Sequence, residues 1–146
     1  MKNELPGAVF VKLGRLLKTD FNSAFKEEFG DEISPTQGAI LGFVGFNPGV
    51  SLTKIASEFS LTKSSGSEAM SILSEKGYVE VRPDPNDKRG RRFYITEKGQ
   101  QVRARAKETL VRNDARLFAE VSEEELEVVE GIYRKVMKAM GRNENE

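Results

Sequence analysis

The chain of 146 residues is 38% hydrophobic and 32% charged, and its 23 basic residues balance its 23 acidic ones. This size suits one hydrophobic core, and the composition is that of an ordinary globular protein rather than a disordered or membrane one. The absence of cysteine and histidine excludes a disulfide framework, a thiol redox sensor, the usual zinc sites and nucleophiles activated by histidine. No carboxylate pair or phosphate-binding loop stands at motif spacing, so we expect no enzyme, no cofactor and no metal site.

The chain carries no pattern of a membrane or export segment. Its longest nearly apolar run, residues 39–46, is far shorter than a membrane span needs. The first residues lack the apolar stretch and the cleavage site of a signal peptide. We therefore expect a cytoplasmic protein with no membrane partner.

Helical spacing dominates the first half of the chain. Apolar residues that recur every three or four positions, together with helix-start and helix-stop residues, predict four helices. They cover residues 8–29, 35–46, 52–59 and the stretch that follows a tight turn at 60–62 and ends at Lys76. Ser34 and Gln37 form a capping box at the start of the second helix, and Gly77 stands where the fourth helix needs a C-terminal cap.

The hydrophobic period then changes from 3.6 residues to 2. Val79 and Val81 share one strand face, and Phe93 and Ile95 share a face on a second strand. Residues 82–92 between them are so polar and so rich in turn formers that we expect the whole stretch to be a hairpin loop.

Two more helices complete the expected order of elements. Thr96 caps a long helix that runs to about Ala119. Ser122 and Glu125 form a capping box that opens a last helix, which continues through Met140. Two short helices joined by a tight turn and followed by a hairpin are the order of a winged helix-turn-helix.

The second helix of that pair must pack one face on the core and offer the other to a DNA groove. A helical wheel places Gly66, Ala69, Met70 and Leu73 on the core side. The residues that we expect to face DNA from this helix are Lys63, Ser64, Ser65, Ser67, Glu68 and Ser71. Short hydroxyl side chains approach base edges and phosphates closely, so the pattern favours DNA contact.

The hairpin supplies a second set of expected DNA contacts. Its basic residues are Lys88, Arg89, Arg91 and Arg92 at the tip and Arg82 at the base. Arginine on a thin loop suits the narrow minor groove, where negative potential is concentrated. Asp87 precedes Arg89 by two positions, and we expect its carboxylate to pair with a guanidinium and fix its direction.

Four stretches stand in a characteristic order along the chain. They are Ser-Leu-Thr-Lys-Ile-Ala at 51–56, Leu-Ser-Glu-Lys-Gly-Tyr-Val at 73–79, Asp-Lys-Arg at 87–89 and Ile-Thr-Glu-Lys-Gly at 95–99. Together they resemble the MarR family of transcriptional regulators, and the resemblance covers essentially the whole chain. It implies a mainly α fold with a small β-hairpin wing, as one domain over residues 1–146. A winged helix at 34–96 would bind DNA, and long helices at 1–30 and 97–141 would form a dimer.

The resemblance also implies a function. Such a regulator would be a homodimer that binds pseudopalindromic double-stranded DNA, acts as a repressor and is released by a small organic effector, often an aromatic one. Arg89 stands at the position of the family's wing arginine and Asp87 at that of its orienting acid. The chain departs from the family at Glu68, where a basic residue is usual, and at Gly66, where a bulkier one is usual. Glu68 repels phosphate but can accept a hydrogen bond from cytosine N4.

Other interpretations stay open on the sequence. A winged helix that contacts protein, without sequence-specific DNA binding, fits the zero net charge and Glu68. Without the wing behind them, the serines at 64–71 would indicate only a solvated helix face. The aromatic stripe that includes Phe21, Phe25 and Phe29 is typical of core or dimer packing, and a ligand pocket is the alternative.

Overall fold

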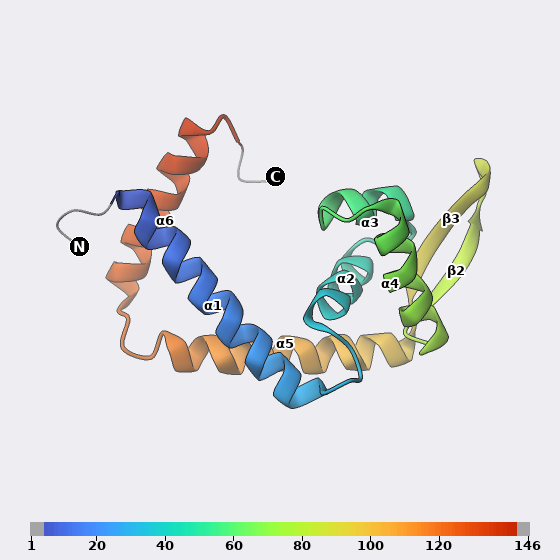
Figure 1. The fold of residues 1–146 in the computed structure, drawn as a ribbon, viewed down its shortest axis with the longest axis horizontal. Helices are drawn as coiled ribbons and strands as arrows, with labels where there is room; N and C mark the ends of the chain where they lie inside the picture. The colour runs from blue at the N-terminus through green and yellow to red at the C-terminus, as the bar shows by residue number, and fades with distance from the viewer. Residues whose placement is uncertain (1–4, 143–146) are drawn as a thin grey trace. The chain divides into compact units, whose positions relative to one another are not determined.

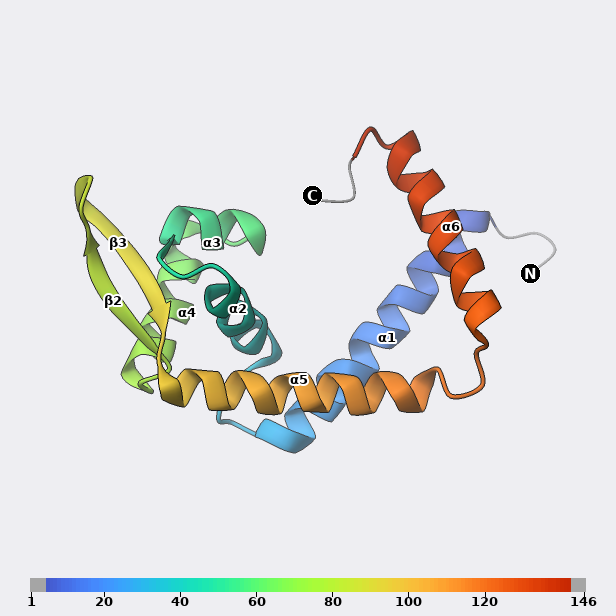
Figure 2. The ribbon, with the colours of Figure 1, turned by 180° about the vertical axis from the view of Figure 1, so that it is seen from behind.

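The computed structural model describes residues 5–142, and the ends of the expected domain, 1–4 and 143–146, lie outside the described residues. The chain is mainly helical with a small antiparallel sheet, as expected (Figures 1 and 2). The elements are α1 (Pro6–Phe29), α2 (Pro35–Phe46), β1 (Val50–Ser51), α3 (Leu52–Glu58), α4 (Lys63–Glu75), β2 (Val79–Asp84), β3 (Asp87–Ile95), α5 (Glu97–Leu117) and α6 (Glu123–Ala139). Two compact units divide within α5, between Asn113 and Asp114.

The helix starts of the first unit are built by local side-chain caps. Ser34 Oγ accepts a hydrogen bond from Gln37 N at 3.1 Å, and Gln37 Oε1 accepts one from Ser34 N at 2.9 Å. This is the predicted capping box, and it satisfies two amides that the first turn of α2 would otherwise leave unpaired. Ser51 caps α3 and Thr62 caps α4 through a single bond each, which their side-chain oxygens accept from Lys54 N and Ser65 N.

The C-terminal end of α4 is also the predicted one. Gly77 adopts a φ of +76°, a left-handed conformation that side chains disfavour. Its amide donates to Ser74 O at 2.9 Å, and the amide of Tyr78 donates to Leu73 O at 2.9 Å. The chain therefore leaves α4 abruptly and enters β2 two residues later.

The core of this unit lies between the end of α1, α2, α3, α4 and the sheet. Its largest fully buried side chains are Phe25, Ile33, Ile40, Leu41, Val44, Ile55, Met70 and Leu73. Gly66 is buried as well and Ala69 is half-buried, so the predicted core side of α4 is confirmed. Burial of this apolar side anchors α4 and leaves its other face free for solvent or a partner.

The sheet has the order β1-β3-β2, and both pairings are antiparallel. Val79 pairs with Ile95 and Val81 with Phe93, so the apolar residues that recur every second position on the two strands lie opposite one another. The expectation that all of 82–92 forms a loop was wrong, because β2 and β3 continue until only Pro85 and Asn86 separate them. Strand pairing needs only backbone groups, so a hairpin exposed on both faces can be polar throughout.

The second unit contains the end of α5 and α6. Ser122 and Glu125 form the predicted capping box, with Ser122 N to Glu125 Oε2 at 2.9 Å and Glu125 N to Ser122 Oγ at 3.2 Å. No residue of α6 is buried. Its exposed apolar side chains recur at helical spacing and include Leu126, Val129, Ile132, Tyr133 and Val136, and the C-cap residue Met140 is exposed as well. Among the described helices, none is long and apolar enough to cross a membrane.

Candidate nucleic-acid interface

The outward face of α4 presents short polar side chains. All six α4 residues expected to face DNA are exposed: Lys63, Ser64, Ser65, Ser67, Glu68 and Ser71. The hydroxyl of Ser65 accepts a hydrogen bond from Thr62 Oγ1 at 2.9 Å, so it belongs to the helix cap while its own hydrogen stays available. This face can approach another molecule closely because its side chains are small.

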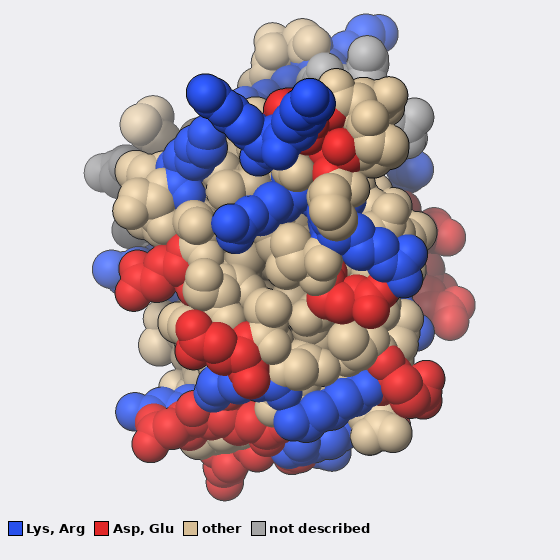
Figure 3. All heavy atoms as spheres, turned by 90° about the vertical axis from the view of Figure 1, so that its right-hand side faces the viewer, with Lys and Arg blue, Asp and Glu red and all other residues tan. Residues whose placement is uncertain are grey.

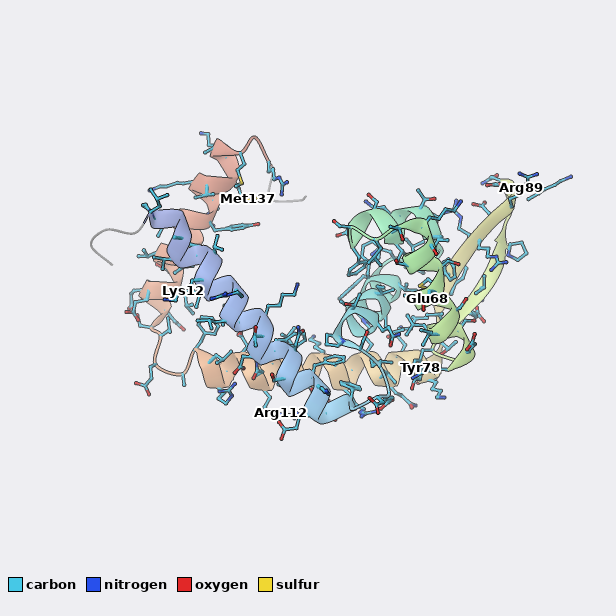
Figure 4. All side chains as sticks on the ribbon, viewed as in Figure 1. Lys12, Glu68, Tyr78, Arg89, Arg112 and Met137 are labelled. Carbon is cyan, nitrogen blue, oxygen red and sulfur yellow. The ribbon has the colours of Figure 1, made fainter. Side chains whose placement is uncertain are left out.

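The charge of α4 is unusual for a helix that would meet DNA. It carries one basic residue, Lys63 at its first position, and two acidic ones, Glu68 and Glu75. Figure 4 shows Glu68 on the part of α4 that lies beside the sheet. Since phosphate contacts supply most of the affinity of DNA-binding proteins, the cations for such contacts must come mainly from outside α4.

The wing, defined as residues 82–92 of the β2–β3 hairpin, supplies those cations. Lys88, Arg89 and Arg91 are exposed, and their side chains form no ion pair with any residue that the structure describes. Arg89 lies at the free end of the wing and points away from it (Figure 4). Figure 3 shows Lys and Arg side chains gathered at the upper end of the face that carries the wing, with acidic side chains more frequent below.

Asp87 has a different partner from the expected guanidinium. Its Oδ1 accepts a hydrogen bond from the backbone amide of Arg89 at 2.9 Å. This side-chain-to-backbone bond, two residues along the chain, is the kind that stabilises tight turns. Asp87 therefore acts on Arg89 through the backbone of the wing, which sets the direction in which the arginine leaves it.

The other two wing arginines are held by the protein itself. Arg82 lies over the ring of Tyr94, 4.3 Å from its centroid, and pairs with Glu80. Arg92 donates from Nε to Asp84 Oδ2 at 2.7 Å and from Nη1 to Gly49 O at 3.2 Å. The structure thus leaves Lys88, Arg89 and Arg91 exposed without an ion pair to any described residue, whereas the equally exposed Arg82 and the half-buried Arg92 are held by neighbouring side chains.

A groove of about 510 Å³ lies between the wing and the starts of α3 and α4. Its lining residues are Ser51, Leu52, Thr53, Lys63, Ser67, Asp84, Asp87, Arg89, Gly90 and Arg91. Sequence reasoning missed the contribution of Ser51, Thr53 and Asp84. The Ser-Leu-Thr order before an amphipathic helix was a signal for a helix start, but it did not show that this start faces the wing.

The groove joins hydroxyl groups, three cations and two carboxylates. The pKa of Asp84 lies below its ordinary value, first because the backbone amide of Asn86 donates to its carboxylate and then because Arg92 donates to it as well. Asp84 is therefore ionised at neutral pH, and its charge is matched by a guanidinium. The remaining positive charge of the groove comes from Lys63, Arg89 and Arg91, which suits an anion such as DNA phosphate.

Comparison with known proteins gives a family match for the central part of the chain. Residues 32–90, which run from the connection before α2 to the wing, match the sequence profile of the MarR family. This part of the chain is therefore similar to proteins of the MarR family.

Relatives of this chain are named as regulators of transcription. One is the transcriptional regulator HosA of Escherichia coli O111:H-, which is 26% identical over 125 residues, 86% of this chain and 92% of HosA. Another is a proposed transcriptional regulatory protein for the hcr operon of Thauera aromatica, 27% identical over 138 residues, 90% of this chain and 82% of that protein. The likeness to these named regulators extends over most of each chain.

Solved structures share the MarR fold along most of the chain. Wild-type MarR of E. coli in its apo form has a TM-score of 0.79 at 20% identity and covers 92% of this chain and 99% of MarR. The PcaV regulator of Streptomyces coelicolor, in complex with its natural ligand, has a TM-score of 0.70 at 23% identity, covering 88% of this chain and 91% of PcaV. At such identities the likeness is one of fold.

Proposed function

We propose that this regulator is a repressor that acts as a homodimer on a pseudopalindromic operator, with α4 in the major groove and the wing at the minor groove of each half-site. The observation that carries the proposal is the set of three exposed cations, Lys88, Arg89 and Arg91, beside the hydroxyl-rich groove at the start of α4. Phosphate contacts from these cations and Lys63 would supply affinity. Base contacts from the α4 face would supply sequence choice.

Most of the residues that the sequence led us to expect at the DNA remain in the proposed interface. Direct contacts are proposed for Lys63, Ser64, Ser65, Ser67, Glu68, Ser71, Lys88, Arg89 and Arg91. Asp87 would act through the backbone of Arg89, as its hydrogen bond indicates. In this proposal, residues 34–96 form the DNA-binding part of one functional domain that acts in the cytoplasm.

Dimerisation is proposed for helices at 1–30 and 97–141. The support is the exposure of large apolar side chains along both: Phe10, Leu13 and Leu16 of α1 are 44%, 45% and 54% exposed. On α6, Val129 and Tyr133 are 49% and 56% exposed. Apolar patches of this kind on a small protein mark an interface. Sedimentation at micromolar concentration should give a dimer, and a monomer would contradict this part of the proposal.

A small organic effector, aromatic or otherwise, is proposed to release the dimer from its operator. The support is the family and the natural ligand seen with PcaV. Titration of a panel of small aromatic carboxylates into the protein–operator complex would test it. If no member of the panel weakens operator binding, the proposed release by such an effector is wrong.

The test of the DNA-binding proposal is selection of random duplex DNA on the purified protein, followed by affinity against salt. We expect an inverted repeat whose half-sites lie about one helical turn apart, bound less tightly as salt rises. The acidic excess on α4 favours one alternative, a winged helix that contacts protein. No enrichment, with weak binding even at low salt, would favour that alternative.

A further inference from the structure

We infer that Asp84 and Arg92 form a brace that fixes the wing relative to the start of α3, and that both act on DNA binding by positioning Arg89 rather than by touching DNA. This inference rests on the proposed DNA-binding function. It changes the role expected for Arg92 from a contact at the wing tip to a residue that acts through others.

The first half of the brace is the carboxylate of Asp84 at the end of β2. Its Oδ1 accepts a hydrogen bond from Asn86 N at 2.9 Å, and its Oδ2 accepts one from Arg92 Nε at 2.7 Å. The Asp84 side chain is only 8% exposed. Each carboxylate oxygen therefore has a partner, one in the turn and one on the opposite strand, so the two-residue turn of the wing is closed around Asp84.

The second half of the brace links the wing to the helix-turn-helix. Arg92 Nη1 donates to Gly49 O at 3.2 Å, while Gly49 N donates to Phe93 O at 2.9 Å. Gly49 directly precedes β1, whose second residue, Ser51, is the N-cap of α3. The carboxylate in the wing is thus connected, through one guanidinium, to the segment that forms the opposite wall of the groove.

The wing needs such a brace because its strand pairing is weakest there. The ladder between β2 and β3 shifts its register between Pro83 and Asp84, and proline has no amide to donate. The pairing of β1 with β3 reaches only as far as Ser51 opposite Arg92. Beyond that point the wing is a two-stranded ribbon, and such ribbons are marginally stable in water.

The charge of Asp84 argues against a direct role in DNA contact. Asp84 lines the same groove as Lys63, Arg89 and Arg91, where an unpaired carboxylate would repel phosphate. A residue that only lowers the local positive charge would weaken binding, so its removal would tighten it. A residue that holds Arg89 in place would have the opposite effect, and this difference in sign makes the brace testable.

The experiment measures affinity for the selected operator with Asp84→Asn, Arg92→Lys, Arg89→Ala and the double variant Asp84→Asn with Arg89→Ala. Asparagine keeps the shape of Asp84 but turns one acceptor into a donor. We expect the Asn variant to bind about tenfold more weakly, the scale of a lost charged hydrogen bond. Arg92→Lys should weaken binding to a similar extent, because an ammonium cannot replace the fork that joins Asp84 to Gly49.

The double variant separates positioning from a merely structural effect. If Asp84 acts through Arg89, Asp84→Asn should cost little further affinity once Arg89 is alanine. Equal losses in the two backgrounds would overturn the inference, as would an Asn variant that binds as tightly as the natural protein or more tightly. Unchanged affinity of Arg92→Lys would also overturn it, since a lysine preserves a simple phosphate contact.

A second measurement tests the brace in the absence of DNA. Amide hydrogen exchange in the free protein should become faster at Asn86 and Arg89 in Asp84→Asn, while the amides of α4 keep their protection. Unchanged exchange in the wing would overturn the brace. If the natural protein selects no DNA sequence, the proposed function fails, and exchange still shows whether the brace exists. Should Asp84→Asn fail to fold, Arg92→Lys carries both measurements.

Discussion

Tyr78 donates its phenolic hydrogen to Glu32 Oε1 at 3.0 Å, which joins the segment that follows α4 to the connection between α1 and α2. Glu32 also accepts two hydrogen bonds from Arg105 of α5, at 3.1 and 3.3 Å. Lys76, the C-terminal cap of α4, donates to the backbone oxygen of Glu32. The end of α4 is therefore tied to α5 and to the connection between α1 and α2 through one residue, Glu32. These bonds fix α4 against helices that the proposal assigns to the dimer.

Loss of the Tyr78 hydroxyl should lower stability. Tyr78→Phe keeps the buried ring, which is 5% exposed, and removes only the bond to Glu32. We expect the free energy of unfolding to fall by about 1–3 kcal/mol, as for other hydrogen bonds to charged groups. Urea unfolding followed by circular dichroism measures it. Tyr133→Phe, at an exposed position of α6, is the matched control and should change little; equal effects of the two variants would contradict the assignment.

The same hydroxyl should make stability sensitive to alkaline pH. Burial raises the pKa of Tyr78 above its ordinary value, and the hydrogen bond to the Glu32 carboxylate raises it further. The unfolded chain then ionises Tyr78 first, so its contribution to folding is complete below about pH 10 and is lost as pH rises through the folded pKa. Stability of the natural protein should fall more steeply above pH 10 than that of Tyr78→Phe. Parallel curves for the two would show that Tyr78 ionises normally.

The sequence predicts the local features of the fold well because they depend on neighbours in the chain. The capping box at Ser34 and the left-handed Gly77 follow from residues at most three positions apart. The partners of Arg92 could not be predicted in this way. Gly49 lies 43 positions away from it, and the pairing with Asp84 depends on a strand register that polar side chains do not reveal. For the same reason β1, which has only two residues, left no periodic signal.

Two glycines should respond to alanine in opposite directions. A β-carbon at Gly99 would overlap the carbonyl oxygen of Tyr78, whereas at Gly66 its nearest neighbours would be Ala56 Cβ at 3.4 Å and Leu52 Cδ1 at 3.5 Å. Gly99→Ala should therefore destabilise by about 1–3 kcal/mol, as overpacking does. Gly66→Ala has ordinary contacts and should stabilise α4 by about 1 kcal/mol. Thermal unfolding of both variants measures the effects, and a shift of the same sign would refute the packing argument.

Removal of the exposed wing arginine should weaken DNA binding. Arg89→Ala is expected to cost about 1–3 kcal/mol if the guanidinium reads a groove. Arg82→Ala is the natural comparison, because Arg82 already lies over Tyr94 and pairs with Glu80. It should lose less affinity than Arg89→Ala when both are titrated with the same operator. A larger loss for Arg82 would mean that the base of the wing, not its tip, meets the DNA.

Glu68 should set a base preference at one position of each half-site. A carboxylate only accepts hydrogen bonds, and in the major groove cytosine N4 is a donor without a neighbouring acceptor on the same base. Adenine also offers a donor, but its N7 acceptor lies beside it and would repel the carboxylate. The exposed position of Glu68 on α4 therefore predicts a cytosine, with discrimination of about 1–3 kcal/mol against other bases.

Glu68→Gln tests that preference directly. Glutamine can both donate and accept, which suits N6 and N7 of adenine, so selection on random duplex DNA should replace the cytosine by adenine in each half-site. Affinity for unrelated DNA should rise at the same time, because a negative charge leaves the interface. Ser71→Ala, one turn further along the same exposed face, is the control and should leave that base unchanged. If the natural protein and Glu68→Gln select the same base at every position, Glu68 does not read the operator.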